Sequence, residues 1–204
     1  MTLKVFGDSA SGNCLKVKWI LNRLDIDYDW TEIDVRSGAT RTVEYLSLNP
    51  AGQVPAVRFE DGRVLAQSNA IIGYLAENTD LVPSDPFERA RMYEWLFWEQ
   101  YSHEPYIAVR RYHLVYLKKQ PEELDPRLFE RGSAALARME AGLEGRDWLA
   151  GDRLSLADVA LVAYTRMAGS GGFDLGLYPR VSAWVERVER ALDLDASTRT
   201  LAPG

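Results

Sequence analysis

The sequence has little with which to build a covalent or metal-held framework. It contains one cysteine, Cys14, and only two histidines, His103 and His113. A single cysteine excludes an internal disulfide framework and suits a reducing compartment. The absence of a Cys-x-x-Cys pair argues against a self-contained dithiol oxidoreductase. A metal site would need carboxylates as its main ligands, so we expect no bound metal.

Long apolar runs and an excess of positive charge are also missing. No stretch approaches the ~20 apolar residues of a membrane span, and the start of the chain does not resemble a signal peptide. The net charge is -6, with both signs scattered, so neither nucleic acid nor a membrane surface is an expected partner. We therefore expect a cytoplasmic protein. Its 204 residues are enough for two small domains.

Strand and helix patterns alternate in the first part of the chain. Apolar residues fall on one helical face from Cys14 to Leu24, and Asp61-Gly62 is a strong hairpin signal. The expected order is β-α-β-α-β-β-α, with the elements at about 3–6, 14–24, 28–35, 41–48, 55–59, 63–65 and 68–75. This order predicts an α/β domain over residues 1–78.

A polar linker at 79–85 precedes a part in which the strand patterns disappear. Asp85-Pro86, with Glu88 at the capping-box position, and Asp125-Pro126 are typical helix starts. The first of these helices is expected to run from about Phe87 towards Lys118. Ser155 and Asp158 predict a further capped start, and Pro179 opens a helix with the apolar stripe Val181, Trp184, Val185 and Val188. Residues 86–204 are therefore predicted to form an all-helical domain.

The segment Gln53-Val54-Pro55 lies directly before a predicted strand. A proline is allowed at the start of a strand, and trans is the commoner state of its peptide bond. A cis bond would instead turn the backbone so that Val54 offers its N–H and C=O to an extended ligand. Dipeptide statistics alone favour the trans bond.

Gln67 and Ser68 stand at the start of another predicted helix. Ser68 can cap that helix, and a helix N-terminus also attracts anions through its unpaired N–H groups. A ligand carboxylate could therefore sit there, with either side chain donating a hydrogen bond. Capping without a ligand is the simpler interpretation of the pair.

Small polar residues, Ser9, Ser11 and Asn13, connect the first strand to the first helix. Backbone donors and the helix dipole favour a thiolate at such a place, and the Ser11 hydroxyl could hold a bound thiol ionised. The alternative role for these residues is helix capping. Cys14 could be a reactive thiol, but its position on the apolar face favours a buried small hydrophobe.

Taken in order, these motifs resemble the glutathione transferase family over almost the entire chain. The resemblance is carried by the Ser-rich first loop, Val54-Pro55, Gln67-Ser68 and the Ser155-Leu156-Ala157-Asp158 box after Trp148-Leu149-Ala150-Gly151. It implies a thioredoxin-like α/β N-terminal domain followed by an all-α helical bundle. It also implies a homodimer.

The resemblance assigns roles to the matched residues. It implies that Pro55 is cis and that Val54 pairs with the cysteinyl backbone of glutathione. Gln67 and Ser68 would hold the γ-glutamyl end, and Gln53 would reach towards the glycyl carboxylate. Asp158 corresponds to the capping acid of the family, which implies a role in folding and not in catalysis.

The residue that activates the thiol is less clearly marked. Phe6 and Gly7 have no hydroxyl, so the chain departs from members with a tyrosine after the first strand. Aligned on Lys16, Ser11 corresponds to the serine of theta- and zeta-like members, where beta-like members keep a cysteine. Asn13 corresponds to an asparagine of bacterial disulfide reductases, and Ser9 is a third candidate. Gly12-Asn13 replaces the Ser-Cys of zeta-like isomerases, so maleylacetoacetate isomerisation is not expected.

The resemblance therefore implies a glutathione transferase with glutathione as co-substrate. The thiolate would attack a small hydrophobic electrophile, as in detoxification, without a metal. One alternative is a glutathione-dependent disulfide reductase or peroxidase. In disulfide reduction the thiolate would attack sulfur instead of carbon. Another is a non-catalytic binding module of the same fold.

Overall fold

The computed structural model describes residues 3–200 and divides the chain into two compact units, with the boundary between Thr79 and Asp80. Within those residues no helix has both the length and the apolar character required to cross a bilayer.

The first unit is a four-stranded mixed sheet with helices, which confirms the expected α/β class and element order. Its elements are β1 (Leu3–Gly7), α1 (Gly12–Arg23), β2 (Tyr28–Glu32), η1 (Val35–Ser37), η2 (Ala39–Arg41), α2 (Val43–Leu48), β3 (Ala56–Arg58), β4 (Val64–Ala66) and α3 (Ser68–Leu75). The strand order is β2-β1-β3-β4. β1 pairs in parallel with β2 and antiparallel with β3, which pairs antiparallel with β4.

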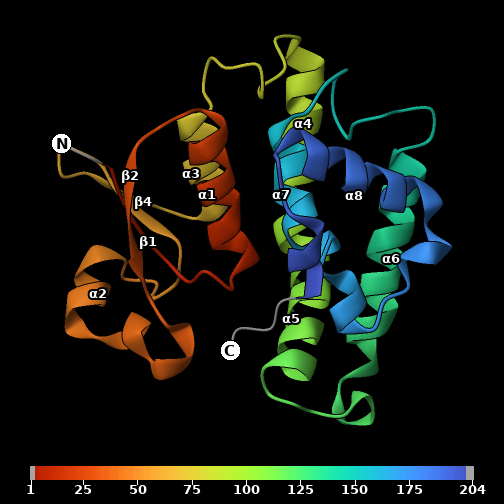
Figure 1. Ribbon diagram of the computed structural model, residues 1–204, viewed down its shortest axis with the longest axis horizontal. Helices are drawn as coiled ribbons and strands as arrows, with labels where there is room; N and C mark the ends of the chain where they lie inside the picture. The colour runs from red at the N-terminus through yellow and green to blue at the C-terminus, as the bar shows by residue number, and fades with distance from the viewer. Residues whose placement is uncertain (1–2, 201–204) are drawn as a thin grey trace. The chain divides into compact units, whose positions relative to one another are not determined.

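Helices α1 and α3 lie side by side along the sheet, and α2 lies away from them in Figure 1. Apolar residues on the faces that meet are fully buried, among them Val5 of β1, Ile20 of α1 and Ile71 of α3. Burial of each such side chain contributes about 1.5–3 kcal/mol. This packing brings the N-termini of two helices to the same part of the unit, because Asn13 and Ser68 contact each other there.

The second unit is helical, as expected. Its elements are α4 (Pro86–Trp98), η3 (Glu99–His103), α5 (Glu104–Val115), η4 (Pro121–Glu123), α6 (Pro126–Gly142), α7 (Leu156–Thr165), η5 (Ala168–Gly171), η6 (Leu175–Leu177), α8 (Pro179–Ala191) and η7 (Ala196–Thr200). The long first helix predicted to run towards Lys118 ends at Val115, and η3 is a π-helical turn within it. Figure 1 shows α4 and α5 continuing in one direction through this turn.

The predicted helix starts are largely confirmed. Asp85 and Asp125 accept backbone N–H groups at the starts of α4 and α6, and Ser155 with Asp158 forms a capping box on α7. Glu88 differs from the prediction, because its carboxylate accepts a hydrogen bond from the Gly151 amide instead of closing a capping box. It therefore joins α4 to the segment before α7.

Asp158 is fully buried and holds three parts of the helical unit together. Its Oδ1 accepts hydrogen bonds from the Leu149 amide (3.0 Å) and the Trp184 indole (2.8 Å). Its Oδ2 accepts from the amide and the hydroxyl of Ser155 (2.9 Å each). Burial raises the pKa of this carboxyl, and the hydrogen bonds oppose the rise. These contacts connect α7 to α8 and fit the expected role in folding.

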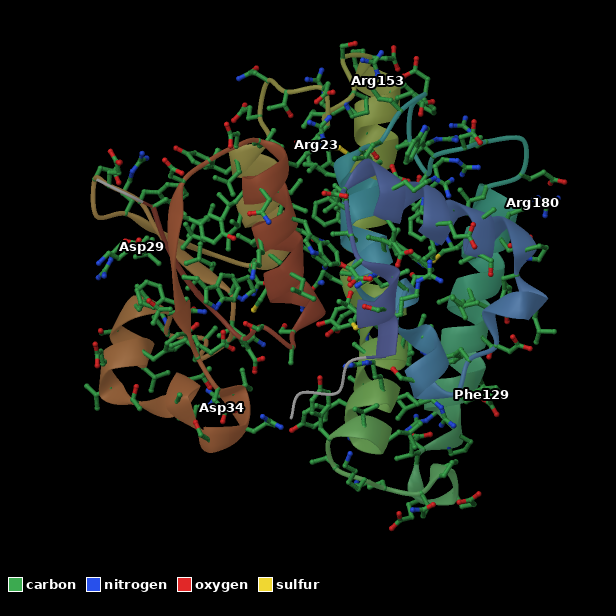
Figure 2. All side chains as sticks on the ribbon, viewed as in Figure 1. Arg23, Asp29, Asp34, Phe129, Arg153 and Arg180 are labelled. Carbon is green, nitrogen blue, oxygen red and sulfur yellow. The ribbon has the colours of Figure 1, made fainter. Side chains whose placement is uncertain are left out.

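Stacked rings join α6 to the segment that follows α7. Phe129 of α6, labelled in Figure 2, stacks on Phe173 with 5.4 Å between the ring centroids and 7° between the planes. The Arg110 guanidinium lies 5.1 Å from the centroid of the Phe129 ring and donates to the Gly171 carbonyl. These contacts fix α5 and α6 against the segment that follows α7.

Candidate active site

The start of α1 holds two of the predicted catalytic residues. Ser11 is the N-cap of α1 by its backbone, but its side chain makes no capping hydrogen bond. That side chain lowers the pKa of the nearby Cys14 thiol, and the sulfur of Cys14 accepts a hydrogen bond from the Asp8 amide at 3.3 Å. The hydroxyl of Ser11 thus lies beside the first turn of α1 and is not used to cap it.

Asn13 lies in the same turn and contacts the start of α3. Its Oδ1 accepts a hydrogen bond from the Ser68 hydroxyl at 3.1 Å, across 55 residues of sequence. The same oxygen accepts from the ammonium of Lys16 at 2.8 Å. The structure therefore brings together Asn13 and Ser68, which come from two separate sequence motifs.

Ser9, the third candidate for thiol activation, hydrogen bonds to β2. Its amide and hydroxyl both donate to the carboxylate of Glu32, at 2.8 and 2.6 Å. The indole of Trp30 donates to the same carboxylate at 2.7 Å. Burial of Glu32 raises the pKa of its carboxyl, but these hydrogen bonds outweigh that effect and lower it. Ser9 therefore ties the first loop to β2.

The Val54–Pro55 peptide bond is cis, which confirms the expectation from the family resemblance and not the one from dipeptide statistics. Gln53, which precedes Val54, is held through its backbone carbonyl. That oxygen accepts hydrogen bonds from the Tyr45 hydroxyl (2.8 Å) and the Asn49 side-chain amide (2.7 Å). The loop that carries Val54 is thus anchored to α2.

Gln67 precedes α3 with an uncommon backbone conformation. Its φ is +71°, a region that non-glycine residues adopt at a cost of about 1–3 kcal/mol. Its side-chain amide lies 3.5 Å from the Oε1 of Gln53. Ser68 follows as the first residue of α3 and is 4% exposed. Both predicted γ-glutamyl residues therefore lie at one helix N-terminus, where backbone N–H groups favour an anion.

Comparisons with known proteins agree with this arrangement. The chain matches the glutathione S-transferase N-terminal domain over residues 10–78 and the C-terminal domain over residues 95–191. It is 30% identical to glutathione S-transferase 3 of Zea mays, over 91% of this chain and 88% of that protein. A crystal structure of a glutathione S-transferase from Pseudomonas fluorescens has a TM-score of 0.90 and 44% identity, covering 93% of this chain and 95% of the other.

The chain belongs to the glutathione S-transferase family. Membership confirms the resemblance inferred from the motifs and supports an enzyme of the glutathione transferase type, with glutathione as the family's co-substrate. The chain is also 29% identical to the disulfide-bond oxidoreductase YfcG of Escherichia coli, over 90% of this chain and 87% of that protein. The family therefore includes relatives of both the transferase and the reductase kind.

The structure leaves no room for a tyrosine at Gly7, the last residue of β1. A Cβ atom added to Gly7 would lie 2.6 Å from the Trp30 ring, a distance that real Cβ atoms do not adopt. A hydroxyl-bearing side chain is thus excluded at Gly7 while Trp30 keeps its place.

Cys14 is buried, as its place on the apolar face predicted. Burial raises the pKa of its thiol to about 12, and the hydrogen bonds from Asp8 and Ser11 only partly oppose this. Burial likewise raises the pKa of the Tyr45 hydroxyl to about 12, with Cys14 adding to the effect. Both groups are neutral at physiological pH and serve the structure of the site.

Sequence reasoning missed two charged residues near these motifs. Lys16 is fully buried beside Asn13, and only the three-residue helical spacing between them could have indicated the contact. Arg41 extends its guanidinium to within 3.5 Å of the Ala51 carbonyl, next to Gly52. It therefore brings a positive charge to the loop before Gln53. No local sequence pattern predicts this contact between Arg41 and Ala51.

Proposed function

We propose that the chain binds glutathione on its first unit and activates the thiol for attack on a small hydrophobic electrophile. The hydrogen bond between Ser68 and Asn13 carries this proposal. Ser68 belongs to the helix start suited to the γ-glutamyl carboxylate, and Asn13 belongs to the helix start suited to a thiolate. One extended tripeptide can therefore reach both ends.

The other contacts follow from the chemistry of the tripeptide. Gln67 and Ser68 hold the γ-glutamyl end, where α3 supplies backbone N–H groups. The N–H and C=O of Val54 pair with the cysteinyl backbone. Gln53 faces the glycyl end, and Arg41 beside the same loop supplies a positive charge for the glycyl carboxylate.

Activation lowers the pKa of the bound thiol. A free thiol has a pKa near ~8.5, and lowering it by two units requires about 2.7 kcal/mol of preference for the thiolate. Hydrogen bonds from the Ser11 hydroxyl and the Asn13 amide, with the N-terminus of α1, are sufficient in size. The proton leaves to solvent, and the sulfur then forms a bond to the electrophilic carbon as that carbon's leaving group departs.

Disulfide reduction is the second candidate function. Asn13 sits beside Ser68, and the similarity to YfcG supports a role for this site in disulfide chemistry. Here the thiolate attacks one sulfur of a disulfide and the other sulfur leaves as a thiol. The products are a mixed disulfide of glutathione and one reduced thiol, and a second glutathione completes the reduction.

The test combines calorimetry with two activity assays. Wild type is expected to bind glutathione, and Ser11→Ala and Asn13→Ala are expected to bind it with a raised thiol pKa. Loss of conjugation in Ser11→Ala supports transferase chemistry. Loss of disulfide reduction in Asn13→Ala, with conjugation kept, supports the second candidate. A wild type that binds no glutathione contradicts both candidate functions. The remaining interpretation is then a non-catalytic binding module of this fold.

We also propose that the chain acts as a cytoplasmic homodimer. Tyr93, Phe97 and Tyr101 follow one another at four-residue spacing along α4 and η3, and they are 44%, 74% and 83% exposed. Exposed aromatic side chains in such a row are typical of an interface. Light scattering on wild type and Phe97→Asp tests this, since the variant should yield monomers if the row is the contact.

A further inference from the structure

Lys16 is a charged residue with no exposed surface. It lies on α1 one turn after Asn13, among apolar residues of the first unit. A buried ammonium needs polar partners, because its removal from water is costly. Its Nζ donates to Asn13 Oδ1 at 2.8 Å and lies 3.4 Å from Asn69 Oδ1. The ammonium is therefore held by side-chain carbonyls at the start of α1 and of α3.

These contacts decide how the Asn13 side chain is turned. An asparagine amide has one acceptor end and one donor end, and an ammonium can only donate. Lys16 and Ser68 both donate to the acceptor end of Asn13. A reversed amide would set its NH₂ group against the ammonium and lose that hydrogen bond. The orientation is thus fixed by the charge of Lys16.

We propose that Lys16 is a positioning residue for thiol activation, which holds the Asn13 carbonyl so that the amide NH₂ is the donor to the glutathione sulfur. This inference rests on the proposed function. The ammonium also polarises the amide, so that its N–H groups become stronger donors to a thiolate.

The direct test is the pKa of bound glutathione, measured by ultraviolet absorbance of the thiolate. In Lys16→Met the thiol pKa is expected to rise by about 1 unit, while the Kd for glutathione changes less than about threefold. The kcat/KM should fall by roughly tenfold at pH values below the thiol pKa, and Lys16→Arg should recover most of this loss. Lys18→Met is the matched control, since Lys18 lies on the same helix over the Trp30 ring.

An unchanged thiol pKa in Lys16→Met overturns the inference. So does an equal rise when Lys16→Met is made in an Asn13→Ala background, because Lys16 would then act without Asn13. In that background we expect almost no additional shift. These results are distinct from failure of the proposed function, which shows as a wild type that neither binds nor ionises glutathione.

A measurement on the wild type keeps the inference testable if Lys16→Met does not fold. The side-chain NH₂ resonances of Asn13, assigned by their absence in Asn13→Ala, are followed by nuclear magnetic resonance during titration with glutathione. They should shift on binding, and more above the thiol pKa than below it. Resonances that stay in place at both pH values overturn the inference.

Discussion

The hydroxyl of Ser68 donates to Oδ1 of Asn13 at 3.1 Å, and so joins the first turn of α3 to the first turn of α1. The two residues come from motifs that are 55 positions apart in the sequence. Each motif alone is consistent with simple helix capping. Their contact supports the proposal that both helix starts belong to one site for an extended ligand with an anionic end and a thiol.

Replacement of Ser68 tests the γ-glutamyl end of this site. Ser68→Ala removes a buried hydroxyl that faces both Asn13 and the start of α3, and a lost hydrogen bond to a charged group costs about 1.5–3 kcal/mol. The Kd for glutathione, measured by calorimetry, should therefore rise at least about tenfold. Ser47→Ala is the control, because Ser47 is exposed on α2 and bonds only a local carbonyl. Equal affinity in the two variants would remove Ser68 from the ligand contacts.

The charge of Arg41 is tested with a shortened ligand. Arg41→Met should weaken glutathione binding by about threefold to tenfold, a modest effect because the guanidinium is exposed. Binding of γ-glutamylcysteine, which lacks the glycyl residue, should be the same in wild type and variant. A similar loss with both ligands would show that Arg41 acts on the loop and not on the glycyl carboxylate.

The fold could be predicted from the sequence because its signals are local. The capping pairs at Asp125 and Ser155 mark helix starts, and Asp61-Gly62 marks a hairpin. The contacts of the site could not be read in this way. The hydrogen bonds of Gln53 with Tyr45, and of Asn13 with Ser68, join segments that meet only when the unit folds. The π-helical turn η3 was also missed, since no residue pattern in the long helix indicates it.

Alkaline pH should destabilise the first unit through Cys14. Its thiol has a pKa of about 12 in the fold, against an ordinary value of 9.0 for an unburied thiol. Because the folded state keeps the proton, its stabilisation is complete below pH 9 and is lost as the pH rises towards 12. At about pH 10.5 the loss amounts to about 2 kcal/mol.

Urea unfolding of wild type and Cys14→Ala measures this loss. The free energy of unfolding of the wild type should fall by about 2 kcal/mol more than that of Cys14→Ala between about pH 8 and pH 10.5. The thiol of the native wild type should also resist alkylation by iodoacetamide at about pH 8. Parallel pH profiles for the two proteins would contradict the burial of an un-ionised thiol.

Asp158 should matter for stability and not for glutathione binding. Asp158→Asn keeps the shape but turns one acceptor oxygen into a donor, which would face either Ser155 or the pair of Leu149 and Trp184. Leaving buried donors unsatisfied should lower the free energy of unfolding by about 3 kcal/mol or more. Asp152→Asn is the matched control, since that side chain is 85% exposed.

Denaturant unfolding and glutathione calorimetry on the same samples separate these roles. Reduced stability with an unchanged Kd is the expected result for Asp158→Asn. An unchanged unfolding curve would show that the four hydrogen bonds to this carboxylate contribute nothing net.

The central claim is that the start of α1 ionises a glutathione thiol held by α3 and the loop at Val54. Its most direct test is an ultraviolet pH titration of glutathione bound to the wild-type protein, at a protein concentration that calorimetry shows to be saturating. The account predicts a thiol pKa about 2 units below that of free glutathione, so that most of the bound ligand is thiolate at pH 7. A bound thiol that titrates as free glutathione does, or no binding at all, would contradict it.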